Sequence, residues 1–319
     1  MEPQRLTVKA ACLRESQWVY WALPLAVGSG AALLFQDLQS PLAPRLALGL
    51  LCGAVVGFSL GLTGGGGSIF AVPLLVYGLD VAPREAVGIS LAAVGATALL
   101  GAIQRLRARE VEIGIGLLFA AGGVLGAPVG SWLGRQLSAD VLLLLFAGLM
   151  AFVAARMWSR AIRRPEETRV VRASLEKSPQ PRAPACRHDP SGQIKLTAPC
   201  MGVMTVVGVS TGLLSGLFGV GGGFAIVPAL VFFSTIDIHR AVATSLLAIA
   251  LISFSGVAAH LAAGQIFAFD LTGLFIAGGA VGMGLGMLLS RRISGPRLQK
   301  LFATAIALVA VSIVVQKLV

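Results

Sequence analysis

Apolar stretches of membrane-spanning character follow one another along almost the whole chain. They occupy residues 18–35, 46–62, 69–79, 86–103, 113–133, 141–158, 197–218, 224–234, 241–261, 267–289 and 298–315. A helix needs about 20 predominantly apolar residues to cross a bilayer, and there its own backbone must satisfy every peptide group. Only 12% of the residues are charged, whereas a soluble domain carries about 25%. The sequence therefore predicts an all-α polytopic membrane protein and excludes a soluble globular one.

The basic residues are concentrated at the ends of these stretches and in one central hydrophilic segment, residues 159–196. The formal net charge is +11, but no aromatic residues alternate with the basic ones, as a stacking surface for nucleic acid requires. Basic segments of membrane proteins remain in the cytoplasm. We therefore expect no nucleic-acid partner and a multi-pass protein of the cell (cytoplasmic or inner) membrane. Its N-terminus and central linker are expected in the cytoplasm.

The apolar stretches form two copies of one unit. A shift of 155 residues, the separation of Pro73 from Pro228, also pairs Ser90 with Ser245 and aligns two glycine-rich segments. Internal duplication of this kind is typical of transporters. The chain then has four parts: an N-terminal tail and extra transmembrane helix at 1–45, a first repeat at 46–158, a basic linker with prolines at 159–196, and a second repeat at 197–319.

The arginines indicate that the two repeats lie in opposite orientations. The loop at 105–109 holds three arginines, whereas the corresponding loop at 262–266 holds no lysine or arginine. The first loop is therefore expected in the cytoplasm and the second outside. Both assignments hold only if each repeat opens with a re-entrant helical hairpin and so makes an odd number of crossings. The sequence predicts inverted repeats and an external C-terminus.

Glycine runs interrupt the first helix of each repeat, at 61–68 and 216–223. Four consecutive glycines in a helix would each cost roughly 1 kcal/mol relative to alanine, so we expect a break there and not a continuous helix. Such backbone is tolerated at membrane depth only inside protein or beside a water-filled cavity. The two inverted hairpin tips are expected to meet near the midplane. Free peptide N–H groups and the positive ends of helix dipoles would favour an anion there.

The predicted substrate-binding residues are those of the two breaks and of the helix that follows each hairpin. In the breaks they are Thr63, Gly64, Gly65, Gly66, Gly67, Ser68, Gly219, Gly221, Gly222 and Gly223. On the following helices they are Ser90, Thr244 and Ser245. The alternative for a membrane hydroxyl is a hydrogen bond to its own helix backbone. Glycines at i, i+4 spacing, such as 53, 57 and 61 or 122, 126 and 130, are interpreted as close helix-packing positions.

Few ionisable residues fall inside the apolar stretches. His239 and His260 are candidates for a proton-coupled step, because histidine titrates near neutral pH. No catalytic residues, metal ligands or cofactor motif are identified, and neither glycine run is followed by the lysine of a nucleotide-binding loop. Four cysteines without a CxxC pair are expected to be free thiols.

Two motifs that occur in both repeats resemble the TauE/SafE sulfite exporter family, also called the 4-toluenesulfonate uptake permease family. They are the glycine run followed by proline at 62–75 and 218–230, and the A-V-[GA]-[IT]-S-L element at 86–91 and 241–246. The resemblance implies a secondary carrier for sulfite, organosulfonates or related sulfur-containing organic acids. The expected partners are a small anionic substrate and the lipid bilayer, and the sequence leaves a homodimer open.

Other functions remain open on the sequence alone. An anion channel or a flippase for a phosphorylated lipid would use the same anion-binding cavity. An intramembrane enzyme is not expected, because no Ser/His/Asp or HExxH arrangement is present. Transport by alternating access, with rocking of inverted halves about a midplane site, is the preferred hypothesis.

Overall fold

The computed structural model describes residues 43–163, 187–188, 194–195, 198–223, 226–227, 229–230, 238–265, 268–290, 304, 306–311 and 313. Its long helices are α2 (Ala43–Thr63), α4 (Pro83–Arg107), α5 (Ile113–Gln136), α6 (Ala139–Arg163), α8 (Ala198–Phe218), α10 (Ile238–Ala262) and α11 (Phe269–Ser290). Within the linker, β1 (Arg187–His188) and β2 (Ile194–Lys195) form a short antiparallel pair. The predicted helix at 18–35 lies outside the described residues.

Six of the described helices are long and apolar enough to cross a membrane. These spans are Leu46–Thr63, Pro83–Arg107, Ile113–Gln136, Cys200–Phe218, Arg240–Ala262 and Phe269–Leu289. Large apolar side chains such as Leu125, Phe152 and Val206 face outward, each more than 60% exposed, whereas the serines near the centre are buried. This pattern suits a lipid surround, and the prediction of an all-α polytopic membrane protein is confirmed.

The first helix of each repeat packs against a helix of the other repeat. The small-residue face of α2 lies on α11, and that of α8 lies on α5. A Cβ placed on Gly57 would lie 1.9 Å from the carbonyl oxygen of Gly279, and one on Gly126 would lie 2.2 Å from that of Val209. Because only glycine permits backbones this close, the i, i+4 glycines are helix-packing positions, as predicted.

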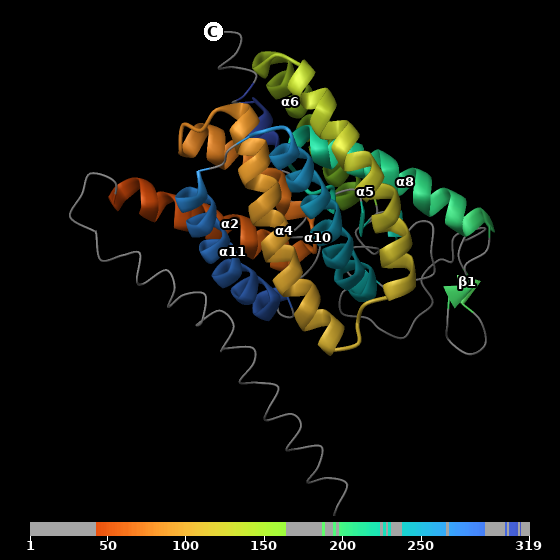
Figure 1. Cartoon of the computed structure of the whole chain (residues 1–319). Helices are drawn as coiled ribbons and strands as arrows, with labels where there is room; N and C mark the ends of the chain where they lie inside the picture. Colours follow the sequence, from red (N-terminus) through yellow and green to blue (C-terminus); the bar gives the residue numbers. More distant parts are fainter. Residues whose placement is uncertain are drawn as a thin grey trace, which may run out of the picture.

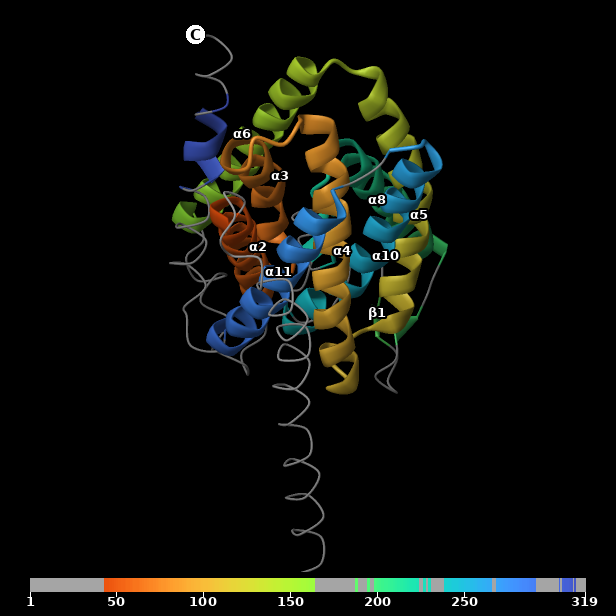
Figure 2. The same cartoon turned by 60° about the vertical axis from the view of Figure 1, so that its left-hand side comes forward.

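At the centre, α4 and α10 lie side by side (Figures 1 and 2). Gly256 meets Leu91 at one end of the contact, and Gly101 meets Leu246 at the other, so the two helices are antiparallel. They are the corresponding helices of the two repeats. An antiparallel pair of equivalent helices is related by a two-fold axis perpendicular to them, and this is the arrangement that inverted repeats require.

The chain reverses direction after α2. Its break at Gly64 and Gly65, both with positive φ, is followed by a helical arm of three short pieces: η2 (Gly66–Phe70), α3 (Ala71–Pro73) and η3 (Leu74–Gly78). The last piece is a π-helical turn, and Pro73 immediately before it cannot donate an amide hydrogen bond. Gly78 returns to the level of Cys52 on α2. The described part of the first repeat thus contains the fold-back hairpin that the charge pattern predicts.

The cysteines differ from the expectation of free thiols. Cys52, buried in α2, is free, but Cys200 near the start of α8 is disulfide-bonded. That part of the prediction is wrong for Cys200. Sequence spacing failed here because a disulfide depends on the proximity of two residues in the fold and not on a local motif.

Candidate functional site

The two glycine breaks touch each other inside the helix bundle. A Cβ placed on Gly65 would lie 2.6 Å from the Cα of Gly223, and the reverse placement gives 2.5 Å. No side chain separates the two backbones at this point. The breaks begin with the same backbone geometry, since φ is 71° at Gly64 and 72° at Gly219, a left-handed conformation that glycine adopts without strain.

A serine from the opposite repeat holds each break. The Ser90 hydroxyl on α4 donates to the carbonyl oxygen of Gly219 at 2.5 Å, and the Ser245 hydroxyl on α10 donates to that of Gly64, also at 2.5 Å. Both serines are fully buried. The structure therefore brings Ser90, Ser245 and the two breaks together, and it does so through hydrogen bonds that cross between the repeats.

The two hydroxyls of the first break bond to nearby backbone. Thr63 donates to the carbonyl oxygen of Ser59 at 2.8 Å and accepts from the amide of Gly67 at 3.2 Å. Ser68 donates to the carbonyl oxygen of Gly65 at 2.7 Å. The two hydroxyl protons that the sequence offers to a ligand are thus used by the backbone in this conformation.

Thr244 lies on α10 beside Ser245 but is engaged elsewhere. Its hydroxyl accepts a hydrogen bond from the amide of Glu112, just before α5, at 3.0 Å. The Glu112 carboxylate also pairs with Arg240 at the start of α10. Thr244 therefore fixes the α4–α5 loop to α10 and does not reach a glycine break.

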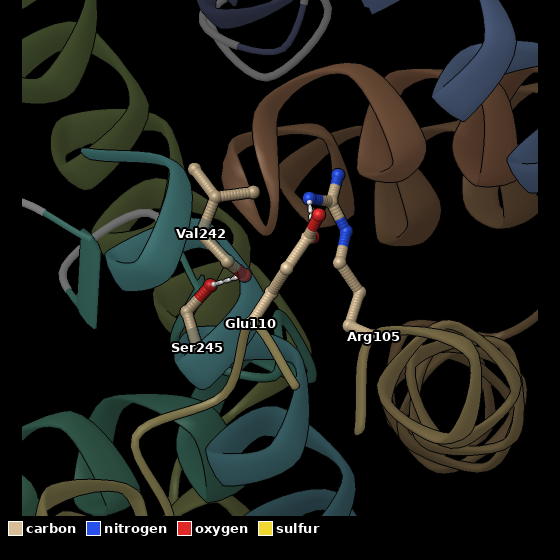
Figure 3. Close-up of polar contacts among 4 residues, drawn as sticks. All are labelled: Arg105, Glu110, Val242 and Ser245. Atoms are coloured by element: carbon tan, nitrogen blue, oxygen red, sulfur yellow. Dashed lines mark hydrogen bonds and ion pairs between the residues drawn. The ribbon is translucent and has the colours of Figure 1, made fainter. Parts of the chain in front are cut away.

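The same loop carries a second ion pair. Arg105 pairs with the Glu110 carboxylate at 2.7 Å, and Figure 3 draws this pair together with the hydrogen bond that Ser245 on α10 donates to the Val242 carbonyl oxygen. Together the two pairs tie α4, α5 and α10 at the end of the bundle nearest the first break. Sequence reasoning placed these charges in a loop but gave no signal that they pair.

A small cavity of about 10 Å³, with room for roughly one water molecule, lies at the other end of α4 and α10. Arg84, Arg135, His260 and Gln265 line it, and it reaches Gly216 on α8, next to the second break. The His260 ring nitrogen Nδ1 lies 2.5 Å from the Gln265 Oε1. His260 is thus a pocket residue and not a residue of the breaks. The side chain of His239 lies outside the described residues.

The His260–Gln265 pair occupies the positions of Arg105–Glu110 in the other repeat. The 155-residue shift that aligns the breaks also aligns these two pairs. Each pair therefore lies at one end of the bundle. The Arg105–Glu110 ion pair lies near the first break, and the His260–Gln265 hydrogen bond lies near the second. Within the described residues, no group of three or more His, Cys, Asp or Glu side chains could hold a metal ion.

This fold and site define a class: an integral membrane transporter whose two helical repeats meet at broken helices. The family model for the sulfite exporter TauE/SafE matches residues 48–313, and the chain belongs to that family. This confirms the family indicated by the repeated motifs, whose members are transporters and not enzymes.

Curated relatives are described as probable membrane transporters. The chain is 36% identical over 268 residues to a probable membrane transporter protein of Xylella fastidiosa strain Temecula1, covering 82% of this chain and 92% of that protein. It is 27% identical over 231 residues to the probable membrane transporter protein YunE of Bacillus subtilis strain 168, covering 69% and 78%. No solved structure matches the chain.

Proposed function

We propose that the protein is a secondary transporter that moves a small sulfur-containing anion (sulfite, an organosulfonate or a related organic acid) by alternating access. The observation that carries the proposal is the direct contact of the two glycine breaks, each held by a serine of the opposite repeat. A relative movement of the repeats must change this contact, because it lies exactly where their backbones meet. The substrate class rests on the family description, sulfite exporter.

The two ends of the bundle support this mechanism. The Arg105–Glu110 and Arg240–Glu112 pairs close the end near the first break. The end near the second break holds the small cavity lined by Arg84 and Arg135, whose positive charges would attract an anion. In the proposed cycle, the substrate enters through this pocket, the breaks separate to admit it, and the ion-paired end opens to release it. Transport of the substrate across the membrane can run in either direction.

The proposed membrane orientation follows the arginines. The ion-paired end of the bundle, which includes the loop at 105–109, faces the cytoplasm. The end with the pocket then faces outward. The breaks lie close to the crossing of α4 and α10, since a Cβ on Gly221 would contact both Val94 and Ile249. This position supports a substrate site near the middle of the bilayer.

The direct test is flux of radiolabelled sulfite in proteoliposomes. A carrier shows saturable uptake that unlabelled sulfite on the opposite side accelerates. Uptake that grows linearly with concentration and shows no such exchange would indicate an anion channel. Transfer of a fluorescent phospholipid between leaflets without sulfite flux would indicate a flippase, and either result would refute the carrier.

A further inference from the structure

Two buried serines of the second repeat have unsatisfied hydroxyls, and both lie beside the second glycine break. The hydroxyl oxygens of Ser215 on α8 and Ser253 on α10 make no hydrogen bond, although both residues are fully buried. Every other buried serine and threonine among the described residues makes one, and these are Ser59, Ser68, Ser90, Thr97, Ser131, Thr211, Thr244, Ser245 and Thr272. An unpaired buried hydroxyl costs free energy, so native proteins rarely keep one without a reason.

Both serines lie against the glycines of the break. The Ser253 Oγ atom is 3.3 Å from the place that a Cβ on Gly221 would occupy. The Ser215 Cβ atom is 3.7 Å from the corresponding place on Gly222. Gly221 and Gly222 both have φ of 67°, which a side chain would strain. The backbone of the break therefore lies next to the Ser253 hydroxyl and beside the Ser215 side chain.

The first break offers nothing equivalent. At the positions that correspond to Ser215 and Ser253 under the 155-residue shift, the first repeat has Leu60 and Ala98, both fully buried. Its own hydroxyls are used by the backbone, as described above. The two breaks thus share a backbone geometry but differ in their side chains: among the described residues, only the second break has buried serine hydroxyls without a hydrogen bond beside it.

The balance of donors and acceptors indicates the charge of the ligand. Three carbonyl oxygens around the second break accept hydrogen bonds: that of Ser215 from the Gly219 amide, that of Gly222 from the Ile226 amide, and that of Gly219 from the Ser90 hydroxyl. The side chains next to the glycines are Val94, Ile249 and Thr211, none of them charged. Two hydroxyls that can each donate a hydrogen bond fit an oxyanion, whereas a metal cation such as Ca²⁺ takes about six oxygen ligands, usually with carboxylates among them.

We infer that the second glycine break is the oxyanion-binding half of the transport site, with Ser215 and Ser253 donating hydrogen bonds to the substrate's sulfite or sulfonate oxygens. The first break, whose hydroxyls already donate to backbone carbonyl oxygens, covers it. This inference rests on the proposed function for the identity of the anion. The substrate enters when Gly65 moves away from Gly223 and uncovers the hydroxyls.

The test compares ligand affinity with stability in the absence of ligand, using full-length purified protein. Ser215→Ala and Ser253→Ala are each expected to weaken sulfite binding about tenfold, because a hydrogen bond to a charged group is lost. Without ligand, their melting temperatures should equal or exceed that of the wild type, because each change removes an unsatisfied hydroxyl. A merely structural serine would lower the melting temperature instead.

Two serines on the same helices serve as controls. Ser210 on α8 is exposed and bonded to Val206, so Ser210→Ala should change neither quantity. Ser255 on α10 donates to the carbonyl oxygen of Val124 on α5 at 2.8 Å, so Ser255→Ala should lower the melting temperature without changing the affinity.

The outcomes separate this inference from the proposed function. If the wild type binds and transports sulfite while the double variant Ser215→Ala/Ser253→Ala binds it equally tightly, the inference is wrong and the proposed function stands. If the wild type binds neither sulfite nor methanesulfonate, both are wrong.

Discussion

Substitution of Gly65 by alanine tests whether the contact between the two breaks is part of the working transporter. The added methyl group would lie 2.6 Å from the Cα of Gly223 and 2.8 Å from its carbonyl carbon and oxygen, whereas ordinary contacts are about 3.4–4 Å. In addition, φ at Gly65 is 148°, a conformation that residues other than glycine rarely adopt. The backbone strain costs about 1–3 kcal/mol and the overpacking about 1–3 kcal/mol. Gly65→Ala should therefore destabilise the conformation in which the two breaks touch by ~2–6 kcal/mol.

The neighbouring glycine provides the matched control. A Cβ on Gly66 would meet only Thr63, at 3.3 Å or more, and Gly66 does not have positive φ. Gly66→Ala should therefore lower the free energy of unfolding by less than about 1 kcal/mol. Both variants are measured by thermal unfolding in detergent and by sulfite exchange in proteoliposomes. We expect a lower melting temperature and strongly reduced exchange for Gly65→Ala, and values close to the wild type for Gly66→Ala. Equal stability and exchange in the two variants would refute the contact between the breaks.

Three further predictions concern the helices and loops around the breaks. Gly57→Ala should lower the melting temperature strongly, because its methyl group would meet an α11 carbonyl oxygen. Gly273→Ala, whose methyl group would meet nothing within 4 Å, should leave the melting temperature unchanged. Equal melting curves for the two variants would contradict the packing of α2 on α11. Ser90→Ala leaves a buried carbonyl of the second break unpaired and should cost about 1–3 kcal/mol of unfolding free energy, measured by denaturant titration of detergent-solubilised protein; a loss below about 0.5 kcal/mol would show that this bond is not formed. Glu110→Gln breaks the partly exposed pair with Arg105 and should change stability by less than about 1 kcal/mol, but it should increase labelling of cysteines introduced at the ion-paired end of the bundle. Unchanged labelling would show that this pair does not close that end.

Much of the fold follows from the sequence because its determinants are local or periodic. The apolar stretches predict the transmembrane helices to within a few residues, as for 113–133 and α5 (Ile113–Gln136). The glycine run at 61–68 predicts the end of α2 at Thr63, since glycine destabilises a helix wherever it occurs. The duplication predicts that whatever forms in one repeat has a counterpart in the other.

The tertiary structure decided which polar groups are free to bind a ligand. From the sequence, Thr63 and Ser68 are predicted ligand donors, and Ser215 and Ser253 are not singled out. In the fold Thr63 donates to a carbonyl oxygen of α2 and Ser68 to one of its own break, whereas Ser215 and Ser253 donate to nothing. A hydroxyl's partner depends on which backbone atoms the packing of α4, α8 and α10 brings within reach, and no spacing along the chain encodes that distance. The sequence by itself determined where the helices break and predicted that the breaks meet, and only the packing of the two repeats decided which break keeps buried hydroxyls without a hydrogen bond.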